Sequence, residues 1–258
     1  ELEEEYQWQG EGTCAADGLC ATRCPVDIDT GAMMKRLRAA GQGGKAQKVG
    51  TWVERNMKGA TAASRLSLGT VKALSQLTGP GALEKSSSGL RSLTGDRIPT
   101  WDRWMPRAAS RMKVPVPIVA PAGKVVYLPS CASRTMGTAV CDTETRDLQQ
   151  VTLSLLSKAG FQVVIPEGLD GLCCGMPFAS KGLEGPAQSA LERTEAAIWN
   201  ASEQSRLPVL CDTSPCTARM IEGFTKPIKI QEPAGFALQH LLPRLDQTRK
   251  VDSIALHV

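Results

Sequence analysis

Histidine and aromatic residues are scarce in this sequence. Its 258 residues include two His, and Phe, Trp and Tyr together make up 4%. Such a low aromatic content argues against the stacking platforms on which single-stranded nucleic acids bind, so no nucleic-acid partner is expected. Long hydrophobic runs are also absent, because no stretch approaches the roughly 18 apolar residues that a membrane span needs.

Cysteine, in contrast, is well represented. There are nine, an odd number that does not suit a closed disulfide framework, and their spacings resemble those of metal ligands. Thiols that stay reduced are typical of a reducing compartment. We therefore expect a cytoplasmic location, either free or with peripheral association at the inner face of a membrane.

The net charge of +4 is unevenly distributed along the chain. From Lys35 to Lys124 there are 17 Lys and Arg against 4 acidic residues, a net of +13, whereas the other residues hold 13 basic and 22 acidic side chains, a net of −9. The basic region is either a solvated surface or a docking face for an acidic partner, an anionic membrane or a neighbouring acidic domain.

The stretch GTCAADGLCATRCPVDIDTG contains the first cysteine motif, C-x5-C-x3-C-P, formed by Cys14, Cys20, Cys24 and Pro25. A bacterial ferredoxin run is C-x2-C-x2-C-x3-C-P, so the two align if Asp17 replaces the second cysteine. A carboxylate can ligate iron, although it is a harder ligand than a thiolate. A structural zinc site is less favoured, since no His lies within two hundred residues of this stretch.

The Cys-Pro ending indicates that this motif lacks ligands. In two-cluster ferredoxins the cysteine before the proline ligates the other cluster. Cys14 and Cys20, with Asp17, would then need a further cysteine, and Cys24 would serve a second cluster. Since no second run of this kind occurs, we expect the missing ligands in a longer polypeptide upstream of Glu1.

A second set of cysteines is spread over the second half of the chain as C-x41-C-C-x36-C-x4-C. Its members are Cys131, Cys173, Cys174, Cys211 and Cys216. Each follows a predicted strand, and the carboxyl ends of parallel strands meet at one edge of a sheet, where ligands bind. We therefore predict that the five converge on one metal site, whereas Cys141 fits no motif and is expected to be a small core residue.

The predicted fold is α+β or α/β. Strands are expected in residues 124–131, 160–168, 207–216 and 226–233, alternating with helices at 142–159, after GLCCGMPF to about 205, and to about 245, which predicts a parallel sheet. Upstream, helices are expected at 32–40 (with Thr30 as a cap), 46–58 and 61–78, and an extended connector at 79–123. The predicted organisation is a ferredoxin-like helical segment (1–45), a basic helical connector (46–123) and a Rossmann-like cysteine-rich domain (124–258).

The CCG loop with flanking single cysteines resembles the cysteine-rich domain of heterodisulfide reductases and of glycolate oxidase iron–sulfur subunits. Together, GTCAADGLCATRCPVDIDTG, CCGMPF and CDTSPC resemble the FAD- and iron–sulfur-containing D-lactate or D-2-hydroxyglutarate dehydrogenases over essentially the whole chain. This resemblance implies 4Fe-4S clusters, an upstream flavin domain carrying FAD, and a cytochrome or quinone-linked electron acceptor. It also implies a second CCG repeat beginning at DSIALHV, so the sequence is expected to be a piece cut at both ends.

Two departures from these families concern the ligands: Asp17 replaces a cysteine, and four residues rather than two separate Cys211 from Cys216. Cys211 is thus the least secure ligand of its set. No residue resembles an acid–base catalyst for a hydroxy acid, so this piece alone is expected to be inactive. Two alternatives stay open, a thiol–disulfide redox module of the heterodisulfide reductase kind and a zinc-stabilised interaction protein.

Overall fold

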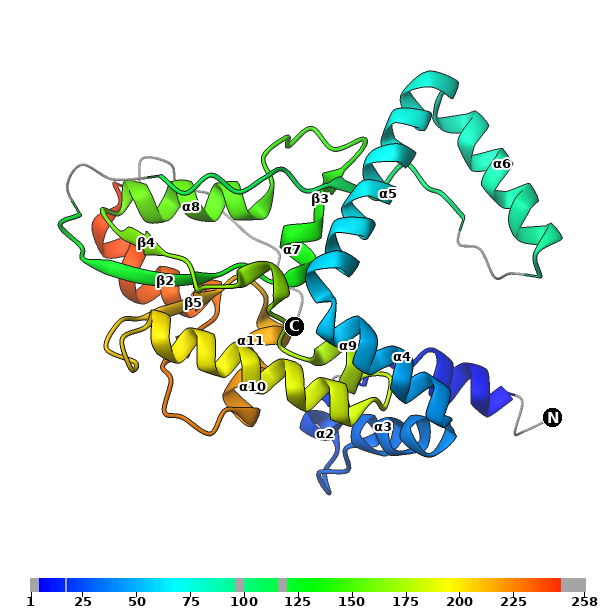
Figure 1. Ribbon diagram of the computed structural model, residues 1–258, viewed down its shortest axis with the longest axis horizontal. Helices are drawn as coiled ribbons and strands as arrows, with labels where there is room; N and C mark the ends of the chain where they lie inside the picture. Colours follow the sequence, from blue (N-terminus) through cyan, green and yellow to red (C-terminus); the bar gives the residue numbers. More distant parts are fainter. Residues whose placement is uncertain (1–4, 17, 96–99, 116–119, 247–258) are drawn as a thin grey trace.

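A four-stranded parallel sheet forms the centre of the second half of the chain (Figure 1). The structure is a computed structural model that describes residues 5–16, 18–95, 100–115 and 120–246. The strands are β2 (Lys124–Leu128), β4 (Gln162–Val164), β5 (Val209–Cys211) and β6 (Ile230–Gln231), and their order across the sheet is β4-β2-β5-β6. The prediction of a mixed α/β chain with a parallel sheet is therefore confirmed.

Helices cover both faces of this sheet because its central strands are apolar on both sides. Val126, Leu128 and Val209 face α10 (Glu184–Ala201) and α11 (Ser214–Gly223). Val125 and Tyr127 face α8 (Leu148–Lys158) and α12 (Pro233–Phe236). A strand that is buried on both faces has a continuous hydrophobic sequence, as KVVYL does.

The order of the strands creates a switch point between β2 and β5. The chain passes from β2 to its neighbour β4, then crosses to the other side of β2 to form β5, and continues outward to β6. The helix that follows β2 in this path, α8, therefore covers one face, whereas α11, which follows β5, covers the other. A crevice at the carboxyl ends of two such strands is the usual ligand site of an open parallel sheet.

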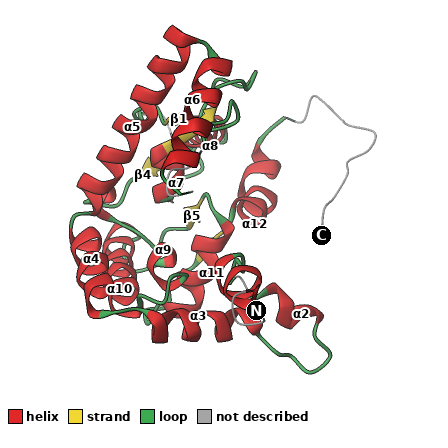
Figure 2. Ribbon diagram, turned by 90° about the vertical axis from the view of Figure 1, so that its right-hand side faces the viewer, coloured by secondary structure: helices red, strands yellow, loops and turns green. Residues whose placement is uncertain are grey.

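The first half of the chain is helical. Its elements are η1 (Gln7–Gly12), α2 (Leu19–Arg23), α3 (Thr30–Gly41), α4 (Gly44–Arg55), α5 (Met57–Thr78) and α6 (Pro80–Leu93). Figures 1 and 2 show α4 beside α10, and α5 as a long helix that crosses the sheet domain near α7 (Cys131–Thr135) before α6 folds back. The helices expected at 32–40, 46–58 and 61–78 are confirmed, with somewhat different ends.

The N-terminal cap of α3 differs from the expectation. Thr30 is the first helical residue, and the preceding Asp29 is the cap, since its carboxylate accepts a hydrogen bond from the backbone N–H of Ala32 at 2.9 Å. Aspartate and threonine are both good caps, so the sequence DTG did not distinguish them.

The prediction of an extended connector at 79–123 is wrong in its first part, because Pro80–Leu93 forms the helix α6. A proline is favoured at the first turn of a helix, where its missing N–H needs no partner. The serines that suggested a loop bond back to their own helix: Ser86 Oγ donates to the carbonyl of Ala82 at 2.8 Å, and Ser88 Oγ to that of Glu84 at 2.9 Å. Within the later part of the connector, Trp101 is buried and Trp104 is exposed.

Two other parts of the sheet domain depart from the prediction. Residues 142–147 are not helical, because Asp147 and Gln150 form a capping box that starts α8 at Leu148. The helix expected to reach about 245 is divided into α12, η3 (Ala237–Leu241) and η4 (Leu242–Arg244). The second repeat expected from residue 252 lies outside the described residues.

A small antiparallel pair was not predicted. It consists of β1 (Pro106–Ala108) and β3 (Met136–Ala139). Cys141, which follows β3, is exposed, so its assignment to the core was wrong. It begins the polar loop CDTETRD, where there is no apolar partner against which to bury a thiol.

Candidate metal centre

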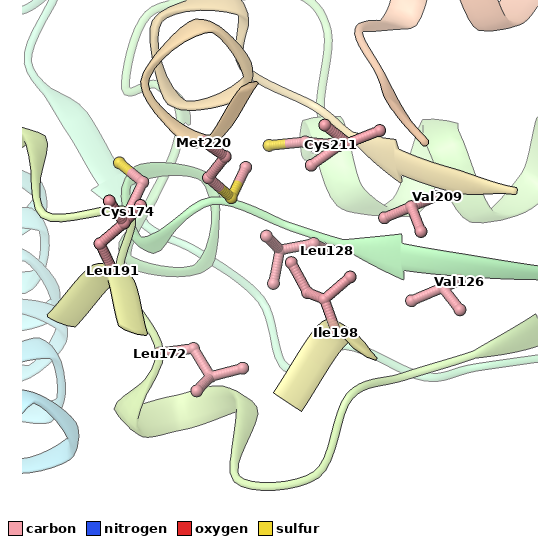
Figure 3. Packing of buried hydrophobic residues seen from close by; sticks show 10 residues of the cluster. Val126, Leu128, Leu172, Cys174, Leu191, Ile198, Val209, Cys211 and Met220 are labelled. Atoms are coloured by element: carbon pink, nitrogen blue, oxygen red, sulfur yellow. The ribbon is translucent and has the colours of Figure 1, made fainter. Parts of the chain in front are cut away.

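The five cysteines of the second set meet at the carboxyl edge of the sheet, as predicted. Cys131 begins α7 just after β2, Cys211 ends β5, and Cys216 lies in the first turn of α11. Cys173 and Cys174 follow η2 (Leu169–Gly171), in the segment after β4. All five line one small cavity with Leu128, Arg134 and Thr194. Figure 3 shows Cys174 and Cys211 at the end of the strands, on either side of Met220.

Four of the thiols form an interacting chain. The Sγ atoms of Cys131 and Cys173 are 4.0 Å apart, and the pKa of Cys174 responds to its neighbours Cys173 and Cys216. Cys211 stands outside this chain, because its thiol donates instead to the carbonyl of Thr213 at 3.8 Å. The structure thus separates Cys211 from the other four, and it was also the least secure member of the set by its spacing.

The contacts shift the pKa values of these thiols in opposite directions. The pKa of Cys131 lies below its usual value, chiefly because of its hydrogen bond with Cys173, and the pKa of Cys174 is lowered by its hydrogen bonding with Cys173 and Cys216. The same interactions raise the pKa values of Cys173 and Cys216. Burial raises the pKa of Cys211 to about 11. Cys131 and Cys174 are therefore the groups most ready to carry negative charge.

The donor set suits a soft metal or an iron–sulfur cluster, since thiolates select these over hard cations. The cavity between the thiols measures about 10 Å³, close to the space of one water molecule. Within the described part of the chain, no three His, Cys, Asp or Glu side chains are grouped tightly enough for a single ion. The residues therefore fit a metal by the chemistry of their donors, and the space between them in this structure holds no more than about one water molecule.

A buried carboxylate holds two of the cysteine-bearing segments together. Asp212, next to Cys211, accepts hydrogen bonds from the backbone N–H of Ser130 at 2.8 Å, from Ser133 Oγ at 2.6 Å and from Tyr127 Oη at 2.9 Å. These groups flank Cys131. Sequence reasoning missed Asp212, although a charged residue directly after an apolar strand was a visible signal.

The CCG loop is held by Thr194 of α10, a second residue that sequence reasoning missed. The backbone N–H of Cys173 donates to Thr194 Oγ1 at 3.1 Å, and the same hydroxyl donates to the carbonyl of Cys173 at 2.8 Å. Gly175, the last residue of the CCG loop, has a geometry that only glycine fits. Its φ is +84°, and a Cβ there would lie 2.3 Å from the carbonyl oxygen of Ala187.

No disulfide joins the three cysteines of the first set, and Cys14 and Cys20 make hydrogen bonds with other residues of the described chain. Cys20 is exposed, and its thiol accepts a hydrogen bond from Thr30 Oγ1 at 2.9 Å, which lowers its pKa. Cys14 accepts one from the backbone N–H of Ala16 at 3.3 Å. Cys24 is half-buried. Asp17, the proposed fourth position of this run, lies outside the described residues.

Arg38 of α3 connects the first cysteine segment to the second site. Its Nη2 donates to the carbonyl of Cys14 at 2.7 Å, and its Nη1 donates to the carbonyl of Ser180 at 2.6 Å. It also donates to the carbonyl of Glu11. Ser180 ends α9 (Met176–Ala179), the short helix that directly follows the CCG loop. No feature of the sequence indicated this role.

Comparisons with known proteins identify no relative: no family model, curated protein or solved structure matches the chain. The two cysteine sites therefore have to be interpreted from their own geometry.

Replacing Thr194 with Val should leave the buried N–H and carbonyl of Cys173 without partners. We expect the free energy of unfolding to fall by about 1–3 kcal/mol, as for other buried polar groups that lose a partner. Denaturant titration measures this, with Thr194→Ser as the control that keeps the hydroxyl. Equal stability of the Val and Ser variants would contradict the role given to Thr194.

Replacing Arg38 with Ala should loosen the first cysteine segment from α9, because three carbonyls lose a charged donor. We expect amide hydrogen exchange in residues 11–24 to quicken by about tenfold, the effect of about 1.4 kcal/mol on a local opening. The neighbouring Arg36, which is exposed on the same helix, supplies the control variant Arg36→Ala. Similar exchange in both variants would refute the bridging role.

Proposed function

We propose that this chain is the iron–sulfur electron-transfer part of an FAD-linked D-2-hydroxy-acid dehydrogenase. In this proposal two electrons leave a D-2-hydroxy acid such as D-lactate at an FAD in an upstream domain and pass singly through this chain to a cytochrome or quinone-linked acceptor. Iron–sulfur clusters, of the 4Fe-4S kind, supply the one-electron carriers. The whole enzyme is proposed to be cytoplasmic or to associate with the inner face of the membrane.

The observation that carries the proposal is the meeting of Cys131, Cys173, Cys174 and Cys216 at the switch point of the parallel sheet. Four soft donors on three separate segments are difficult to explain as independent core residues, since their thiols form one interacting chain. The link through Arg38 supports a part for the first cysteine set as well, because Arg38 joins the ferredoxin-like run to the helix that follows the CCG loop.

An exposed stripe on α4 offers a surface for the electron acceptor. Trp52 is 64% and Val49 is 61% exposed. Three exposed cations, Lys45, Lys48 and Arg55, surround them. A positive face with an aromatic centre suits an acidic protein partner. Within the described residues, no helix has both the length and the hydrophobicity to cross a membrane.

The thiol–disulfide alternative is favoured by one observation, the 4.0 Å contact between the Sγ atoms of Cys131 and Cys173. Two cysteines this close could exchange with a sulfur substrate without a metal. Turnover of a heterodisulfide rather than D-lactate by the full-length protein would support this alternative over the dehydrogenase.

Anaerobic reconstitution with iron and sulfide tests the metal site directly. We expect the chain to bind iron and acid-labile sulfide, and Cys131→Ser and Cys174→Ser to lose most of the iron bound in the sheet domain. Cys141→Ser is the matched control, since Cys141 is an exposed thiol away from the site. Retention of zinc without labile sulfide would favour the zinc alternative, and equal iron loss in all three variants would contradict the assigned ligands.

The reduction of the acceptor by the full enzyme should slow as salt rises if the α4 stripe docks an acidic partner. Exposed charge pairs are screened over about 8 Å at physiological ionic strength. Stopped-flow measurement over a range of NaCl concentrations checks this, with Lys48→Gln expected to flatten the salt dependence and Lys181→Gln, on the loop after α9, as control. A rate that does not change with salt would instead support a merely solvated basic surface.

A further inference from the structure

A cavity of about 380 Å³ lies next to the cysteine site and has an excess of positive charge. Arg65 of α5, Arg111 from the segment after β1, and Arg134 of α7 all line it. The only acidic side chain among its described lining residues is Asp170. Three arginines from three separate segments therefore line one space that has a single acidic residue in its described lining.

Two of these arginines, Arg65 and Arg111, have few other partners among the described residues. Arg65 Nη2 donates to the carbonyl of Ala109 at 3.0 Å, and no ion pair involves Arg65 or Arg111 in the described part of the chain. Arg111 is exposed. A guanidinium has five N–H donors in a planar fork that matches the oxygens of a carboxylate or phosphate. Arginines used only for solubility do not converge in this way on a cavity.

Arg134 connects this cavity to the cysteines, since it lines both. It is buried, with 8% of its surface exposed, and it donates to the carbonyls of Leu172 at 2.6 Å, Ser130 at 3.3 Å and Leu169. Leu172 directly precedes Cys173. All three nitrogens of its guanidinium thus hold the two segments that carry Cys131 and Cys173, so Arg134 brings positive charge to the wall of the cavity while it fixes the backbone beside the cysteines.

We propose that the cavity between Arg65, Arg111 and Arg134 binds a small molecule bearing a carboxylate or phosphate group. The volume is at the lower end of the range for small-molecule sites, so the ligand is of metabolite size. A group bound by Arg134 also restrains the carbonyls of Leu169 and Leu172, and through them the backbone that leads into the CCG loop. The binding claim does not depend on the proposed electron-transfer role.

Isothermal titration calorimetry of the full chain with inorganic phosphate and, separately, with oxalate tests the site, with NaCl added to equalise ionic strength. Saturable binding of one of the two identifies the preferred group. Arg111→Gln and Arg65→Gln should each weaken this binding by about tenfold, the effect of losing one charged hydrogen-bond pair. Arg103→Gln removes an exposed arginine outside the cavity and should change the binding affinity by less than about twofold.

Hydrogen exchange supplies the second measurement. The anion that binds should slow exchange in residues 169–175 of the wild-type chain and of Arg103→Gln, but not of Arg111→Gln. Absence of saturable heat with both anions would overturn the proposal, as would equal weakening by Arg103→Gln and Arg111→Gln, which would mean diffuse attraction to a basic surface. If the anion binds but exchange does not slow, the binding site is supported and its connection to the CCG loop is refuted.

Discussion

The parallel pairing of β2 with β5 is the constraint on which the cysteine site depends. Leu128 lies opposite Cys211 in this pairing, so the segment containing Cys131 leaves the sheet at the same level as Asp212. The helices that follow diverge to opposite faces, which leaves the edge between the two strands accessible. Asp212 then fixes the two ends together, because a buried carboxylate has to keep its hydrogen-bond donors.

Separate polar groups hold the backbone of each cysteine segment, while the thiols bond mainly to one another. Asp212 holds the segment at Cys131, Thr194 holds Cys173, and the left-handed Gly175 allows the turn after Cys174. The backbone of these segments is therefore held by contacts that involve no metal. In this respect the site differs from a zinc finger, which folds only with the ion.

The sequence predicted the features that depend on strong local patterns. KVVYL and PVLC are apolar runs next to loop signals, so both strands were predictable. Because parallel strands end at one edge of a sheet, the convergence of five distant cysteines was predictable too. Features that depend on single side-chain contacts were not predictable. The serines of α6 suggested a loop but bond within a helix, and Cys141 is exposed rather than part of the core. Thr194 and Arg38 act on backbone atoms far away in the sequence, which no local pattern encodes.

Helix α4 has a buried inner face and an exposed outer face. Val53 on its inner face and Met57 at the start of α5 pack in the same cluster as Cys131 and Cys173, whereas Trp52 on its outer face is exposed among cations. A helix with its side chains is about 10–12 Å across. An acceptor docked on the outer face, as proposed, would therefore be separated from the cysteine site by about the thickness of one helix. Under the proposed function, docking at these cations would keep the path of an electron short.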